Sequence, residues 1–349
     1  MGDSRAPVVA VCMATYNPEP VLFAQQIRSL GDQLFTDWTC YVSDDCSDPE
    51  GFATVLRETQ GDPRFVVDRS PERLGVYRNF ERALRMVPDR ARLVALADQD
   101  DSWYPDKLQM LVQACESGAD LVYSDFHVAD QDGRILAPTF WTSRRNYWDR
   151  FDLLAVLNTV TGAAAMFPRS LLDDALPFPP MPDPAWHDHW LTLVAVARGQ
   201  LAYVDKALYA YVRHASNVTG GNYDVRPRRE LRLRGLRTAY GNMLGGWKAQ
   251  YEGGVRYTEH MAEQVHQRLG HRVRQPRQVD RARRLSSSLL SLLWVMRLAL
   301  RPIRDQDPVT PIRARNLLRG IAYWRAARMR MWLRSESPHV PPASAWLVR

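Results

Sequence analysis

The sequence predicts an α/β fold with a doubly wound, mostly parallel sheet, followed by a basic α-helical region. Two observations predict the sheet: short apolar runs alternate with helical patterns over residues 8–126, and polar or acidic loops follow three of those runs. The third observation is a change of charge along the chain. Residues 225–349 carry 26 Lys and Arg against 8 Asp and Glu, a net of +18, which leaves −11 of the total +7 for residues 1–224. We therefore expect two domains, 1–224 and 225–349.

Each expected strand is a short apolar run. The first covers residues 8–13, which are apolar throughout as in a central parallel strand, and a helix follows to about residue 34. Strands at 38–43, 65–67, 93–97 and 121–125 alternate with helices at roughly 50–60, 76–87 and 105–116. After a mixed, proline-rich region, residues 201–204 and 208–212 are typical of two more strands.

Acidic side chains follow the strand at 93–97 directly. Residues 98–101 read Asp-Gln-Asp-Asp, and three carboxylates so close together repel one another unless a positive charge lies between them. Oxygen ligands at Asp98 and Asp100 suit Mg²⁺ or Mn²⁺, whereas the alternative is an acidic turn with Asp101 or Ser102 as the N-cap of the next helix. Because the carboxyl ends of parallel strands lie on one edge, we expect this loop to meet residues 15–17 and 44–45 there.

The sequence lacks the motifs that are typical of several other classes of protein. The chain has no G-x-G-x-x-G after the first strand and no phosphate-binding G-x-x-x-x-G-K-[ST] motif. Its four cysteines form no C-x-x-C pair, so neither a zinc site nor a disulfide framework is expected. Nucleic acid is not expected as a partner, because the Arg-rich region carries no recognition motif.

The basic region contains two apolar segments. Residues 285–300 are too short and interrupted to span a bilayer. Residues 317–333 mix Arg, Trp and aliphatic residues at near-helical spacing, which fits either an interfacial helix on an anionic membrane or a helical bundle that packs internally or forms a homodimer. The first residues lack an apolar signal-peptide core, so we expect a cytoplasmic protein, either free or peripheral on the inner face of the membrane.

Taken together, the motifs resemble the family 2 glycosyltransferases, which have the GT-A fold and use nucleotide sugars. The resemblance covers about residues 8–220 and rests on an ordered set: Thr15-Tyr16-Asn17, Asp44-Asp45-Cys46-Ser47, Leu74-Gly75 with Asn79, Asp98-Gln99-Asp100-Asp101, Thr161-Gly162, His187-Asp188-His189-Trp190, and Arg213-His214-Ala215-Ser216-Asn217. Within the family, the chain looks most like the rhamnosyltransferase-like branch, which usually takes dTDP-L-rhamnose and builds bacterial surface polysaccharide.

The resemblance implies a role for each motif. Nucleotide-sugar binding would fall to Thr15, Tyr16, Asn17, Asp44, Asp45, Asp98, Gln99 and Asp100. In this scheme one of Asp44 or Asp45 accepts the pyrimidine N–H, and Asp98 contacts the ribose. Asp100 and a neutral His214 would hold the Mg²⁺ or Mn²⁺ that bridges the diphosphate. Asp188 would be the general base of an inverting transfer, although it follows His187 here rather than the Glu that is commoner in the family.

Other interpretations stay open for each motif. Residues 44–48 also fit an Asx-rich turn, and His214 a structural histidine. Residues 187–190 are expected as an extended loop, with Trp186, His187 and Trp190 at the acceptor, although the tryptophans fit a core or lid equally well. The donor sugar and base, the acceptor (a saccharide, a lipid-linked saccharide or a natural product), the choice of Mg²⁺ or Mn²⁺ and the oligomeric state are open. A UDP-hexose donor and a non-catalytic nucleotide-binding scaffold are the alternatives.

Overall fold

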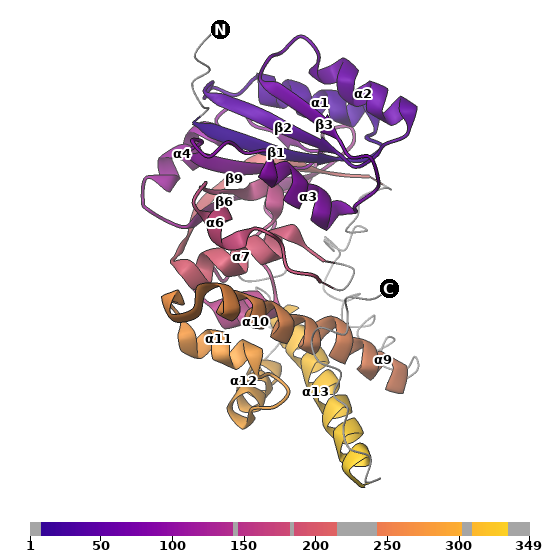
Figure 1. Ribbon diagram of the computed structural model, residues 1–349, viewed down its shortest axis with the longest axis vertical. Coiled ribbons are helices and arrows are strands. Elements are labelled where there is room, and N and C mark those ends of the chain that lie inside the picture. Colours follow the sequence, from indigo (N-terminus) through magenta and orange to yellow (C-terminus); the bar gives the residue numbers. More distant parts are fainter. Residues whose placement is uncertain (1–7, 142–145, 182–184, 215–242, 302–308, 334–349) are drawn as a thin grey trace. The chain divides into compact units, whose positions relative to one another are not determined.

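The computed structural model describes residues 8–141, 146–181, 185–214, 243–301 and 309–333 (Figure 1). The chain forms two compact units. The N-terminal unit comprises Met1–Phe140, Val160–Phe178 and Ala185–Tyr223, and the C-terminal unit comprises Trp141–Thr159, Pro179–Pro184 and Asp224–Arg349. The C-terminal unit thus includes residues 141–159, which precede the last strands of the N-terminal unit in the sequence.

A mixed sheet forms the centre of the N-terminal unit. Its parallel half contains, in spatial order, β3 (Phe65–Arg69), β2 (Trp38–Asp44), β1 (Val9–Thr15) and β4 (Leu93–Ala97). All five residues of β4 are buried, as are nearly all of β1, because helices cover both faces of these central strands. The predicted strands of this half, and their parallel direction, are confirmed.

The other half of the sheet departs from the expected run of parallel strands. β8 (Ala165–Pro168) lies between β4 and β6 (Leu121–Asp130) and is antiparallel to both. The two strands expected at 201–204 and 208–212 are one strand, β9 (Leu201–Arg213), which runs parallel to β6 with shifts in register near Ser124 and Asp125. The short strands β5 (Ser102–Trp103) and β7 (Ile135–Ala137) pair with β9 and β6.

Helices connect and cover these strands. They are α1 (Pro20–Gly31), α2 (Pro49–Thr59), α3 (Val76–Arg85), α4 (Lys107–Cys115), α6 (Leu171–Ala175), α7 (His187–Arg198) and the 3₁₀ turn η1 (Gly162–Ala164). α1 and α2 lie on one face of the sheet, and α3 and α7 on the other (Figure 1). Proline at the first helical positions and the side-chain caps Glu19 and Asp48 explain where α1 and α2 begin.

The prediction of an extended loop at residues 187–190 is wrong, because α7 begins at His187. Residues 188–197 are almost continuously buried, with Leu191, Val194 and Val196 in the core. The burial of this apolar run gives the segment a helical conformation. As a result His189, which the extended loop would have turned toward solvent, is buried.

The C-terminal unit is helical. It consists of α5 (Phe151–Val156), α9 (Met243–Gln250), the π-helical turn η2 (Tyr251–Arg256), α10 (Tyr257–Leu269), the 3₁₀ turn η3 (Gly270–Arg272), α11 (Pro276–Arg283), α12 (Leu289–Ala299) and α13 (Val309–Leu333). Leu317 and Ile321 of α13 pack with Val255, Val295 and Leu298 in one apolar core. Across the ranges that the structure describes, no helix is both long enough and apolar enough to cross a membrane.

Asn79 joins α3 to the carboxyl ends of β1 and β2, from which the predicted loops begin. Its side-chain amide donates to the carbonyl oxygens of Ser43 at 2.8 Å and Thr15 at 3.3 Å, and its Oδ1 accepts from the Ser43 hydroxyl at 2.6 Å. Ser43 and Thr15 are near the ends of β2 and β1, and Asn79 is 2% exposed. This motif residue therefore holds the strand ends together.

We predict that Asn79→Ala lowers the free energy of unfolding by about 1–3 kcal/mol, because it removes the side-chain hydrogen bonds to two buried carbonyl oxygens and the acceptor of the Ser43 hydroxyl. Urea unfolding of the full chain measures the change. Gln113→Ala, at an exposed site on α4, is the matched control. An unchanged urea midpoint for Asn79→Ala would contradict the assignment.

Candidate active site

The predicted convergence of three loops at one sheet edge is confirmed. The Tyr16 amide donates to Oε1 of Gln99 at 2.9 Å, and Nε2 of Gln99 donates back to the Tyr16 carbonyl at 3.4 Å. The Asn17 amide donates to the Ser47 hydroxyl at 2.8 Å, and Asn17 Oδ1 accepts from the amide of Asp48 at 2.9 Å. The loops after β1, β2 and β4 are thus joined by direct hydrogen bonds.

Asp44 and Asp45 are both buried and bonded to neighbouring chain segments. Asp44 accepts from the amide and hydroxyl of Ser47 at 3.0 and 2.5 Å and from the hydroxyl of Thr15 at 3.3 Å. Asp45 accepts from the amides of Leu74 and Gly75 at 2.6 and 2.9 Å, just before α3. The two carboxylates therefore shape the loop, and the Asx-turn interpretation describes Asp44 well.

The acidic loop lies beside His214, at the end of β9. The Nε2 atom of His214 is 2.8 Å from Oδ2 of Asp100, and the two side chains are 6% and 18% exposed. The hydrogen bond to Asp100 raises the pKa of His214. Residues 114 positions apart in the sequence are thus in direct contact, as their shared assignment to one metal ion requires.

The pKa of Asp98 depends on the other carboxylates of the site. Burial raises the pKa of Asp98 to about 7, helped by the charges of Asp100 and Asp188 and opposed by Lys107. Burial also raises the pKa of Asp101, which is 1% exposed, and the charges of Asp98 and Asp100 add to this rise. The loop therefore holds its negative charges at a free-energy cost that a neighbouring cation reduces.

That cation is Lys107, at the first turn of α4. Its side chain is fully buried, its Nζ donates to the Ala163 carbonyl at 2.5 Å, and it lies 3.6 Å from the ring centre of Trp103 and 4.1 Å from that of Tyr209. Burial lowers the pKa of Lys107, and the charges of Asp101 and Asp98 counteract this. Lys107 thus links the acidic loop, β5, η1 and β9.

Asp188 lies in the first turn of α7. A helix N-terminus favours negative charge, and Oδ1 of Asp188 accepts from the amide of His189 at 2.5 Å. Burial is the larger effect and raises the pKa of Asp188 to about 7. Since the charge of Asp188 also raises the pKa of Asp98, the two carboxyl groups are close enough to interact.

His187 is packed rather than presented to solvent. Its ring stacks on Phe80 with centroids 3.6 Å apart, and burial lowers its pKa to about 3, so the imidazole is neutral. Among the described residues, neither ring nitrogen of His187 has a hydrogen-bond partner. A Cβ added at Gly162 would lie 2.6 Å from Nε2 of His187, which explains why glycine stands in the Thr161-Gly162 motif.

The two tryptophans of the predicted acceptor site differ. Trp186 is the N-cap residue of α7 and is partly exposed. Trp190 is fully buried and donates from Nε1 to the Ala175 carbonyl at 2.9 Å, so it belongs to the core. Of the two, only Trp186 has surface available to an acceptor.

Asp100 and His214 suit a divalent cation that is completed by a ligand. Across the described ranges no group of three or more His, Cys, Asp or Glu side chains is arranged to hold a metal. Mg²⁺ and Mn²⁺ usually bind one or two protein groups together with substrate phosphates, rather than a cage built only of protein. The pair therefore fits a cation that enters with a diphosphate, and its mutual hydrogen bond would have to open.

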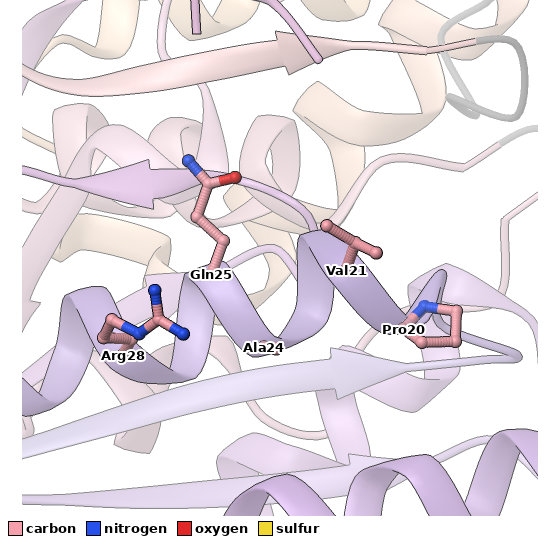
Figure 2. A pocket seen from close by; sticks show the side chains of 5 residues that line it. All are labelled: Pro20, Val21, Ala24, Gln25 and Arg28. Atoms are coloured by element: carbon pink, nitrogen blue, oxygen red, sulfur yellow. The ribbon is translucent and has the colours of Figure 1, made fainter. Parts of the chain in front are cut away.

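An open hollow on α1 involves a different part of the unit. It is lined by Pro20, Val21, Ala24, Gln25 and Arg28. Figure 2 shows these side chains along one helix. None of them belongs to the predicted site.

Two residues of the site were missed in the sequence. Lys107 carried a signal, because three clustered carboxylates need a cation and it is the first one after Asp101. Phe80 carried none beyond its place on the apolar face of a helix, since its contact with His187 joins residues that are far apart in the chain.

Comparison with known proteins agrees with this geometry. Residues 10–176 match the family model for glycosyl transferase family 2. The chain is 26% identical over 139 residues to the uncharacterized glycosyltransferase MJ1057 of Methanocaldococcus jannaschii, covering 39% of this chain and 47% of the relative. It is 28% identical over 129 residues to the putative teichuronic acid biosynthesis glycosyltransferase TuaG of Bacillus subtilis, covering 36% and 50%. The chain thus spans about half the length of these curated relatives.

A solved structure has the same fold. TarS of S. aureus, crystallised with UDP-GlcNAc, superposes with a TM-score of 0.54 at 14% identity, covering 93% of this chain and 91% of that one. At this identity the similarity concerns the fold. Residues 10–176 are therefore similar to the glycosyltransferases of family 2, and the mixed sheet and this structural similarity give the chain the GT-A fold.

Proposed function

We propose that this protein is a metal-dependent, inverting glycosyltransferase that moves a sugar from a nucleotide donor to a hydroxyl group of an acceptor. The observation that carries the proposal is the meeting of the acidic loop, His214 and Asp188 at the carboxyl edge of the sheet. Ligands bind at this edge in open α/β sheets. Of the open alternatives, a scaffold that only binds nucleotides would not need a carboxylate such as Asp188 beside the acidic loop.

The donor nucleotide would lie across the joined loops after β1, β2 and β4. Tyr16 and Asn17, with Thr15 behind them, would line the base and ribose, and Arg73 lies 4.0 Å from the ring centre of Tyr16. Asp45 is the better candidate for the base N–H, because Asp44 already accepts from three donors. Asp98 would contact the ribose, and Gln99 holds Tyr16 in position.

Asp100 and His214 would hold Mg²⁺ or Mn²⁺ against the diphosphate. When bound, the metal neutralises the charge that develops on the leaving nucleotide diphosphate. His214 would have to be neutral to act as a ligand, so metal binding would displace the proton that now lies between His214 and Asp100.

Asp188 would act on the acceptor. Its carboxylate takes the proton of the acceptor hydroxyl while that oxygen bonds to the anomeric carbon from the side opposite the departing diphosphate. General base catalysis of this kind contributes roughly 10²–10⁴-fold. One displacement inverts the anomeric centre, so a β-L-rhamnose donor would give an α-linked product.

The finer assignments rest on the motif resemblance. We take dTDP-L-rhamnose as the donor, with a UDP-hexose as the alternative. The acceptor would be a saccharide, a lipid-linked saccharide or a natural product, with Trp186 at its edge. The proposal includes action in the cytoplasm or at the inner face of the membrane.

The donor site is tested by thermal unfolding with dTDP, UDP and GDP, each with Mn²⁺ and with EDTA. A ligand that binds only the folded state at a hundredfold excess over its Kd stabilises it by about 2.7 kcal/mol. We expect a rise in Tm with dTDP and Mn²⁺ that disappears in Asp100→Ala and in His214→Ala. Asp132→Ala, on an exposed loop, is the control.

Preference for UDP would keep the enzyme class and replace the sugar. No response to any nucleotide would refute the donor site. Stabilisation that is as large with EDTA as with Mn²⁺ would refute the role of the metal.

The general base is tested by the pH dependence of kcat/KM. Because the carboxyl group acts when ionised and burial raises its pKa to about 7, we expect kcat/KM to fall about tenfold per pH unit below pH 7 and to level off above it. Asp188→Asn should lower kcat by roughly 10²–10⁴-fold and remove this limb, whereas Asp132→Asn should not. A wild-type profile with its midpoint near pH 4 would contradict the assignment.

Gly162→Ala tests whether the contact between η1 and His187 positions Asp188. The added methyl group displaces His187, the first residue of α7, and we expect kcat to fall on the order of 10²-fold because small misplacements of catalytic groups are costly. At Gly31 an added Cβ meets nothing within 4 Å, so Gly31→Ala is the matched control. If both variants kept wild-type kcat, this positioning role would be wrong.

A further inference from the structure

α12 is apolar on two opposite sides. One side, with Val295, Leu298 and Ala299, packs in the core of the C-terminal unit. The other side is exposed: five residues, which we call the α12 stripe, have exposed fractions between 40% and 78% and are Leu289, Leu290, Leu293, Met296 and Leu300. A helix that is apolar all round is usually buried or in contact with lipid.

The spacing makes the stripe continuous. Leu289, Leu293 and Met296 are four and three positions apart, and Leu300 follows after another four, so they lie along one line of the helix surface. The twelve residues from Leu289 to Leu300 extend about 18 Å, whereas the hydrocarbon core of a bilayer is about 30 Å thick. The stripe is therefore suited to lie along an apolar surface and not to cross one.

The charges around the stripe are of one sign. Residues 281–301 contain Arg281, Arg283, Arg284, Arg297 and Arg301 and no Asp or Glu. Arg281, Arg283 and Arg284 form ion pairs with acidic residues of the C-terminal unit. Arg297 and Arg301 are exposed at the edge and end of the stripe, and among the described residues they form no ion pair.

This combination favours an anionic lipid surface over a second copy of the chain. A second copy of the stripe would offer Arg297 and Arg301 no counter-charge, because residues 281–301 contain no Asp or Glu, and parallel packing would place the arginines of both copies beside each other. An anionic bilayer surface offers acyl chains to the leucines and phosphate groups to the arginines.

We propose that the α12 stripe binds the surface of a membrane containing anionic phospholipids, with its leucines among the upper acyl chains and Arg297 and Arg301 at the phosphates. This assigns the contact to α12. Residues 317–333, for which the sequence left open a membrane contact or an internal bundle, direct Leu317 and Ile321 into the core. The proposal rests on the C-terminal unit and does not depend on the donor or the acceptor.

Cosedimentation of the full chain with vesicles tests it. One set of vesicles contains phosphatidylcholine alone and the other also contains phosphatidylglycerol. We expect binding to the anionic vesicles to weaken on the order of 100-fold in the triple variant Leu290→Ser, Leu293→Ser, Leu300→Ser. The double variant Arg297→Gln, Arg301→Gln should weaken it about 30-fold at low salt.

The matched control replaces exposed apolar residues of the N-terminal unit, with Val21→Ser, Leu34→Ser and Leu56→Ser, and should bind like the wild type. All these sites are exposed, so thermal unfolding should show intact folds. Failure of the wild type to bind anionic vesicles would overturn the proposal, as would equal binding by the triple variant. A dimer in light scattering that the triple variant dissociates, without vesicle binding by the wild type, would assign the stripe to self-association instead.

Discussion

The N-terminal unit is organised around acidic side chains that are partly or fully removed from water. Asp98, Asp101 and Asp188 are carboxyl groups whose pKa is raised by burial, and each would be unstable as an isolated ion. The positive charge of Lys107 stabilises the ionised forms of Asp98 and Asp101. Lys107 is itself fully buried, so its own desolvation costs free energy. The rings of Trp103 and Tyr209 and the carbonyl of Ala163 replace part of its lost hydration. α4, η1 and β9 are consequently fixed by the same charges that would bind the donor.

The low polarity of the site also determines which of its ionisable groups are charged near neutral pH. Burial raises the pKa of Asp98 and Asp188 to about 7, whereas it lowers the pKa of His187 to about 3, because desolvation always disfavours the charged form. Asp188 can therefore exchange a proton near neutral pH, and the adjacent imidazole of His187 acts only as a packed ring. His214 differs because a direct hydrogen bond to Asp100 outweighs its burial and raises its pKa.

Arginine serves two purposes in the C-terminal unit. Arg150 and Arg281 both bond the fully buried carboxylate of Asp152, which ties α5 to α11. Breaking such a pair on one side leaves an uncompensated charge, so these arginines are part of the fold. Arg297 and Arg301 are outside these internal pairs, beside an exposed apolar stripe. The excess of positive charge in this region is therefore only partly available to an anionic partner.

Local patterns in the sequence were sufficient to predict several elements of the fold. Fully apolar runs specified β1 and β4, alternation with helices specified their parallel direction, and the common edge of a parallel sheet specified that residues 15–17, 44–48 and 98–101 would meet. It also paired Asp100 with His214, through a family resemblance. Contacts between distant segments placed β8 between β4 and β6, gave residues 187–190 a helical conformation and brought Lys107 near the acidic loop. They also left one apolar side of α12 exposed. Each of these depends on which distant segment lies beside the residue, and hydrophobic periodicity reports which face of an element is apolar but not what covers it.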